Sequence, residues 1–162
     1  MSIPVTEVLN HWSHTFQDFS LSANEFYSKL NTMVTDQQMP NVKCGTTSHK
    51  EGGTFSASRD YYRVVYRDLV FDICAAPFGK NFFISWWLYE TQGAMRSLFK
   101  KTQIGNLLQA RAAKRTFFQM DAEQMFKDCI HDCVLQSVAA VSESKGFRQL
   151  TDQEKQYKEG GF

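Results

Sequence analysis

Two things are missing from this sequence: a hydrophobic run long enough to cross a membrane, and a secretion signal. The longest apolar run, from Phe82 to Tyr89, is interrupted by Ser85. It is far shorter than the roughly 20 residues of a spanning helix. The first residues contain no basic stretch followed by an apolar one, as a signal peptide would. Without such a signal, the 4 cysteines indicate free thiols in a reducing compartment. We therefore expect a soluble, cytoplasmic protein.

Motifs for nucleophilic catalysis and for nucleotide binding are missing as well. The sequence has no G-x-S-x-G turn, no glycine-rich phosphate loop and no dinucleotide fingerprint. We therefore assign no catalytic residue, favour a non-enzymatic protein and expect no cofactor.

Cysteine and histidine occur at two short spacings that could suggest zinc. Cys129 and Cys133 stand one helical turn apart with His131 between them, but both cysteines fall on an apolar stripe and His131 falls off it. No paired C-x-x-C knuckle accompanies them. His11 and His14 lie three residues apart in a predicted helix without an H-E-x-x-H pattern. We interpret the cysteines as core residues and His11 and His14 as solvated or edge residues, and predict no metal site.

Acidic charge is missing between Glu90 and Asp121. That interval contains six basic residues, which leave −5 for the rest of a chain whose net charge is +1. They alternate with apolar residues in a basic amphipathic segment, 94–115, predicted to form two short helices: Arg96, Lys100, Lys101, Arg111, Lys114 and Arg115. The segment fits a solvated surface excursion, a protein-binding helix or attachment to an anionic membrane surface. Nucleic acid is disfavoured because the charged footprint is thin.

Aromatic residues are plentiful, with 14 Phe, 6 Tyr and 3 Trp among 162 residues. A chain of this length fits one domain with its own core. We predict a single α+β domain over residues 1–150, followed by a polar C-terminal tail over 151–162.

Two N-terminal helices are predicted. Apolar residues recur at three- and four-residue steps from Val5 to Phe19, which indicates a first amphipathic helix. Ser22 and Glu25 form a capping-box pattern for a second helix, with Leu21 and Phe26 at the positions of a hydrophobic staple. Pro40 marks its exit.

From residue 41 the hydrophobic period becomes two, which predicts an antiparallel meander. The expected strands are 42–47, 60–66, 69–76 and 81–89. A tight turn at 67–68 pairs Val64 with Phe71, and a longer loop over 77–80 pairs Ile73 with Ile84. The sheet is predicted to have four or five strands, the fifth over 116–120.

A long C-terminal helix follows, capped by Asp121, and it is predicted to pack on the sheet and to end at Gly146. Its apolar stripe is predicted to contain eight residues: Met125, Phe126, Cys129, Ile130, Cys133, Val134, Val138 and Val141.

Pairing the strands separates the sheet into a core face and a mixed face. The mixed face is too aromatic for bare solvent, so we expect a protein partner or a second copy of the chain to bind there. The residues predicted to bind are Val65, Val70, Phe83, Trp87 and Tyr89. The same face carries a cross-strand ion pair, Arg63 and Asp72.

Our leading hypothesis is a protein-interaction module that binds a partner or forms a homo-oligomer. One alternative is a small-molecule-binding protein or enzyme with an apolar pocket between sheet and helix, where Arg63 and Asp72 would be the polar pair. The other is peripheral membrane association through residues 94–115.

Overall fold

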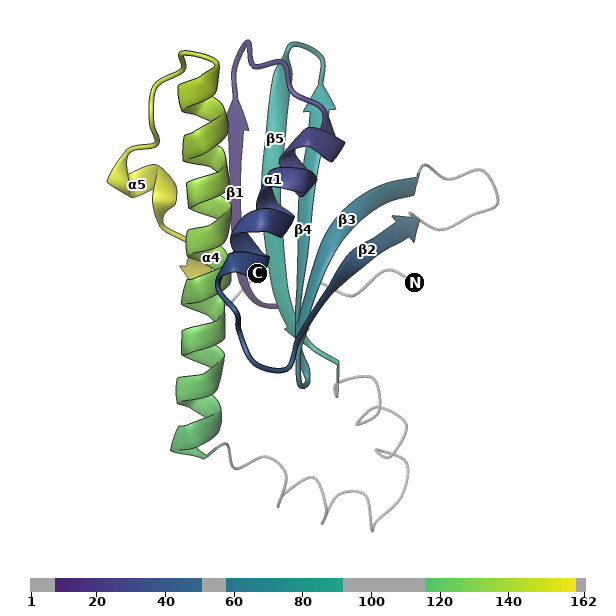
Figure 1. The fold of residues 1–162 in the computed structure, drawn as a ribbon, viewed down its shortest axis with the longest axis vertical. Helices are drawn as coiled ribbons and strands as arrows, with labels where there is room; N and C mark the ends of the chain where they lie inside the picture. The colour runs from purple at the N-terminus through teal and green to yellow at the C-terminus, as the bar shows by residue number, and fades with distance from the viewer. Residues whose placement is uncertain (1–7, 51–57, 92–115, 160–162) are drawn as a thin grey trace.

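The computed structural model describes residues 8–50, 58–91 and 116–159. Six strands and three helices make up these ranges (Figure 1). In chain order they are β1 (Val8–Phe16), α1 (Ala23–Asp36), β2 (Val42–Lys50), β3 (Ser58–Tyr66), β4 (Leu69–Phe78), β5 (Asn81–Glu90), α4 (Phe117–Ser144), α5 (Asp152–Lys155) and β6 (Lys158–Glu159). The α+β class with an antiparallel sheet is confirmed.

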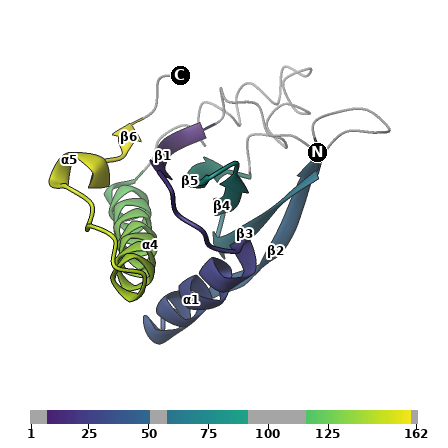
Figure 2. The same cartoon turned by 90° about the horizontal axis from the view of Figure 1, so that it is seen from above.

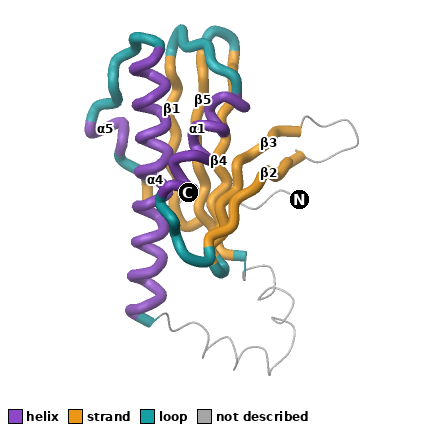
Figure 3. Tube along the Cα trace, viewed as in Figure 1, coloured by secondary structure: helices purple, strands orange, loops and turns teal. Residues whose placement is uncertain are grey.

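The strands form one antiparallel sheet in the order β2-β3-β4-β5-β1-β6. Helices α1 and α4 cover one face of it (Figure 2). Figure 3 shows both helices on the same side of the strands, with α4 beside β1. The core fills the space between these two layers, and its largest fully buried side chains include Trp86, Phe26, Phe71 and Phe82.

The predicted first helix, Val5–Phe19, is wrong, because its described part forms strand β1 from Val8 to Phe16. β1 pairs with β5, and Trp12 lies opposite Trp86. Trp12 and Phe16 are both buried, and residues four apart share one face of a strand as well as one face of a helix. The spacing of these large residues therefore does not separate the two structures.

The second predicted helix is confirmed as α1. The Ser22 hydroxyl accepts a hydrogen bond from the backbone N–H of Glu25 at 3.1 Å. Leu21 and Phe26 are both buried around this start, as a hydrophobic staple requires.

The four-strand meander is confirmed, with one change of register. Val64 pairs with Phe71 as predicted, but Ile73 pairs with Trp86 instead of Ile84. The strands extend to Phe78 and Asn81, which pair with each other, so the turn is shorter than the predicted loop. Gly79 adopts the left-handed conformation (φ +62°) that such a turn requires. A shift of two residues leaves the two faces unchanged.

Helix α4 begins earlier than predicted. Its N-cap is Thr116, which forms a reciprocal capping box with Gln119, so the predicted strand over 116–120 is wrong. Gly146, with φ +72°, follows the C-cap residue as expected. The predicted stripe is buried except at Met125, which is 72% exposed, and Cys129, which is half-buried. Both lie in the N-terminal half of α4, and this half extends past the end of α1 in Figure 1.

The basic segment 94–115 lies outside the described residues, and so do its six cationic side chains.

Candidate functional site

An apolar groove of about 450 Å³ lies beside the N-terminal half of α4. One wall is α4, and the other is the connection from α1 to β2 together with the ends of β2 and β3. We call it the α4 groove; it is lined by Met39, Pro40, Val42, Tyr66, Phe118, Asp121, Ala122, Met125, Phe126 and Cys129. Asp121 is the one charged residue among these lining residues.

The floor of the α4 groove is packed against the core. Phe126 is buried, and its ring centroid lies 5.4 Å from those of Tyr66 and Phe71. The Arg67 guanidinium lies 5.1 Å from the Tyr66 ring centroid and 5.3 Å from that of Phe118. This cation bridges an aromatic residue of β3 and one of α4, so part of the wall is held by cation–π contacts.

Large apolar side chains in the first turns of α4 are exposed, and two of them, Phe118 and Met125, line the groove. The first three turns of α4 present Phe117 at 87%, Phe118 at 64%, Met120 at 54% and Met125 at 72% exposure. Large contiguous apolar patches are uncommon on soluble monomers and mark interaction sites.

The predicted Arg63–Asp72 pair is part of a larger polar cluster on the sheet face opposite α1 and α4. Arg63 donates to Asp72 through Nε at 2.6 Å and Nη2 at 2.7 Å, a bidentate geometry. The Tyr89 hydroxyl donates to Asp72 Oδ2 at 2.9 Å and accepts from Arg63 Nη2 at 2.8 Å. His49 Nε2 lies 2.8 Å from Asp72 Oδ2.

Electrostatics favour the protonated forms of two members of this cluster, Arg63 and Tyr89. Hydrogen bonding to Asp72 raises the pKa of Arg63, so the guanidinium stays charged. Burial, followed by the charge of Asp72, raises the pKa of Tyr89 above its usual range, and the phenol stays a donor. Because Asp72 is 3% exposed and already accepts from three side chains, the cluster is suited to stabilising the sheet.

The residues predicted to bind on the mixed sheet face differ in accessibility. Val70 and Tyr89 are buried, whereas Val65, Phe83 and Trp87 are half-buried. The Trp87 ring stacks on His11 with centroids 3.6 Å apart. His11 reaches this face from β1, and His14 lies on the opposite face, 3.8 Å from Glu154. The two histidines therefore do not converge on one ion.

His131 was expected off the apolar stripe, but it is buried. Its Nδ1 accepts from the Trp86 indole N–H at 3.0 Å, and its Nε2 lies 2.6 Å from the backbone oxygen of Lys155. Burial lowers the pKa of His131, which keeps the ring neutral. The Trp12 indole donates to the backbone oxygen of Glu154 at 2.7 Å. Both ring nitrogens of His131 thus make hydrogen bonds within the fold. Together with the Trp12 bond, they attach α5 to β1 and α4.

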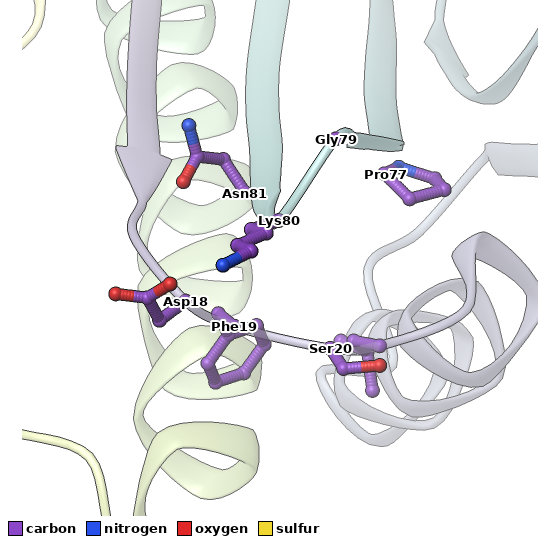
Figure 4. A pocket seen from close by; sticks show the side chains of 8 residues that line it. Asp18, Phe19, Ser20, Pro77, Gly79, Lys80 and Asn81 are labelled. Carbon is purple, nitrogen blue, oxygen red and sulfur yellow. The ribbon is translucent and has the colours of Figure 1, made fainter.

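A second cavity of about 340 Å³ lies at the other end of the sheet, between the β1–α1 connection and the β4–β5 turn. Figure 4 shows Asp18 and Phe19 on one side of it, and Gly79, Lys80 and Asn81 on the other. None of the predicted site residues lines it.

Within the described ranges, no three His, Cys, Asp or Glu side chains are grouped so as to hold a metal ion. Over the same residues, no helix is long and apolar enough to span a bilayer.

The described part of the chain is thus a six-stranded antiparallel sheet with α1 and α4 on one face and an apolar groove beside α4. No protein family, curated protein or solved structure matches this chain.

Sequence reasoning missed the α4 groove because it treated Met125 and Cys129 as part of a continuous core stripe. One signal was present. Phe117, Phe118 and Met120 extend the apolar pattern of the helix to the N-terminal side of the predicted cap at Asp121. A helix longer than the layer it packs on leaves such residues without a covering element.

Proposed function

We propose that this protein is a non-enzymatic protein-interaction module whose partner binds in the α4 groove. One observation carries the proposal: an apolar groove is lined by two large apolar side chains, Phe118 and Met125, that are more than half exposed. Methionine and aromatic side chains are favoured at such surfaces, since they bury much apolar area and methionine adapts its shape.

The mixed sheet face and the basic segment 94–115 belong to the same proposal as further contact surfaces. Val65, Phe83 and Trp87 are partly accessible on that face and could extend an interface there. The partner is a second protein or another copy of this chain. The space between the sheet and α1 is filled by side chains such as Phe26, Leu30 and Phe71, each 0% exposed, which favours a partner protein over a small molecule buried in that layer.

The test compares the proteins captured by the wild-type chain with those captured by a groove variant. Met125→Asp places a charge on an exposed groove residue, so folding should be preserved while apolar contact is lost. Phe78→Asp is the matched control, because Phe78 is 78% exposed at the end of β4, away from the groove. We expect quantitative affinity capture from the native cell to show a protein lost with Met125→Asp and kept with Phe78→Asp.

Light scattering on the wild-type, Met125→Asp and Phe78→Asp proteins tests whether the chain self-associates. If the partner is a second copy, Met125→Asp should reduce the apparent mass and Phe78→Asp should not. Identical capture profiles together with identical masses for all three proteins would contradict the proposal.

A further inference from the structure

The α4 groove is elongated along its helix. Its lining residues on α4 run from Phe118 to Cys129 at steps of three and four, which keeps them on one face over three turns. Eleven residues of helix correspond to about 16 Å. A groove of this length and apolar character matches the anchoring side chains of an amphipathic helix, which recur at i, i+3 or i+4, and i+7.

Acidic side chains lie along the α4 edge of the groove. Residues 117–132 of α4 contain four acidic residues against one basic residue, Lys127; Asp121, Asp128 and Asp132 share one side of the helix, and Glu123 lies on the other. Lys127 is 4% exposed, and its ammonium lies 4.9 Å from the Tyr157 ring centroid, so it is turned away from solvent. Asp121 and Asp132 are eleven residues apart, a spacing that returns to the same face of a helix as Met125.

The Arg67 guanidinium lies near the groove, and its contacts affect where the charges of a ligand can bind. Arg67 is placed against the Tyr66 and Phe118 rings, so the aromatic wall already accommodates a guanidinium. Since Arg67 already places a positive charge on these rings, the cations of a ligand would pair with the carboxylates of Asp121 and Asp132 instead.

We propose that the α4 groove binds a basic amphipathic helix of a partner protein. The inference rests on the proposed function and names the chemistry of the partner. Apolar side chains on one face of the ligand helix fill the groove beside Met125 and Phe118. Lysine or arginine side chains on its flank face Asp121 and Asp132.

The experiment uses labelled synthetic peptides of about 18 residues, five helical turns. One combines leucine and lysine in an amphipathic pattern, a second replaces every lysine with glutamate, and a third scrambles the first. Fluorescence anisotropy against the full chain should show the leucine/lysine peptide binding at least about tenfold more tightly than the other two. Binding should be lost in Met125→Asp, unchanged in Phe78→Asp, and weakened with a smaller salt dependence in Asp121→Asn/Asp132→Asn.

Each other result overturns the inference in a distinct way. Equal affinity for the two amphipathic peptides, both lost in Met125→Asp, would refute the charge preference and leave the proposed function standing. Binding that survives Met125→Asp would place the peptide elsewhere. Failure of all three peptides would refute a helical ligand, whereas the capture comparison tests the proposed function independently.

The basic segment of this chain, residues 94–115, has the same chemistry as the proposed ligand. A separate variant therefore tests whether that segment competes for the groove. Changing Leu98, Leu107 and Leu108 to serine removes apolar side chains from that segment in the full chain. An unchanged peptide affinity supports a partner helix. A gain of tenfold or more would assign the groove to residues 94–115 of this chain and overturn the partner proposal.

Discussion

Asp72 is a carboxylate on a central strand with 3% of its surface exposed. An isolated buried carboxylate is costly, and here Arg63, Tyr89 and His49 supply the compensating hydrogen bonds. Arg63 lies directly opposite Asp72 in the β3–β4 register, so the cross-strand pairing places both charges on one face. Removing one partner costs more than removing both, because it leaves the other charge buried.

Arg63→Ala should therefore lower the free energy of unfolding by about 2–3 kcal/mol. This is less than the 3–5 kcal/mol of a fully buried pair, because the Arg63 side chain is 30% exposed. Urea denaturation followed by tryptophan fluorescence measures the change.

A double-mutant cycle provides the control for this prediction. Arg63→Ala combined with Asp72→Ala should cost less than the sum of the two single changes, by an interaction energy of about 1 kcal/mol or more. Strict additivity would show that the pair contributes nothing as a pair.

At the scale of elements, the short helix α5 is attached to the domain through backbone oxygens. Trp12 of β1 and His131 of α4 hold the carbonyls of Glu154 and Lys155. The Thr151–Glu154 capping box and a bidentate ion pair from Arg148 to Glu154 fix the local conformation. Hydrogen bonding to Arg148 holds the pKa of Glu154 well below its usual range, so the pair persists in mild acid.

His131→Phe should reduce stability by about 2–4 kcal/mol. The phenyl ring keeps the bulk but leaves the Trp86 indole N–H and the Lys155 carbonyl without a partner, at roughly 1–3 kcal/mol for each buried group. Amide hydrogen exchange should also rise in residues 150–157. Unchanged exchange there would show that His131 does not hold this segment.

Sequence patterns predicted the elements in which local chemistry and hydrophobic period agree. Ser22 and Glu25 mark the start of α1, and alternation from residue 60 onward defines β3 to β5. β1 was missed because Trp12 and Phe16 fit both periods, and only pairing with β5, over 60 residues away, decides between them. The buried position of His131 was missed for the same reason. It depends on Lys155 and on Trp86 of a distant strand, which no local pattern reveals.

The site was predicted only in part. The Arg63–Asp72 pair follows from strand register, but His49 joins it from β2, whose register a sequence leaves open. The α4 groove depends on how far α4 extends past α1, and this is a property of the assembled layers.

For the whole molecule, two histidines, the buried His131 and the half-buried His14, couple stability to pH. Burial lowers the pKa of His131 and of His14 below 6.5; Glu154 opposes this at His14, and the Lys155 carbonyl, Asp132 and Asp128 oppose it at His131. The folded state then binds fewer protons than the unfolded state below about pH 6.5. The contribution of the two histidines to stability is fully present above that pH. It is lost as the pH falls from their unfolded pKa toward their lowered folded pKa values.

We therefore expect the free energy of unfolding to fall between pH 7 and pH 5. The slope is at most about 1.4 kcal/mol per pH unit for each histidine. Urea denaturation across this range measures it. His131→Phe should flatten the slope, since one titrating group is removed; an unchanged slope in that variant would assign the effect to other groups.

The bond from Trp12 to the carbonyl of Glu154 joins residues 142 positions apart. During synthesis, Trp12 leaves the ribosome long before its partner exists, and the part of the β1 edge that pairs with β6, at Asn10 and His11, stays open until residues 158 and 159 emerge. The nascent chain therefore exposes an unpaired strand edge next to a large indole until these residues have been synthesised. A chain that terminates early, before residue 154, keeps that edge for its whole lifetime, and we expect such truncated products to aggregate or to be degraded.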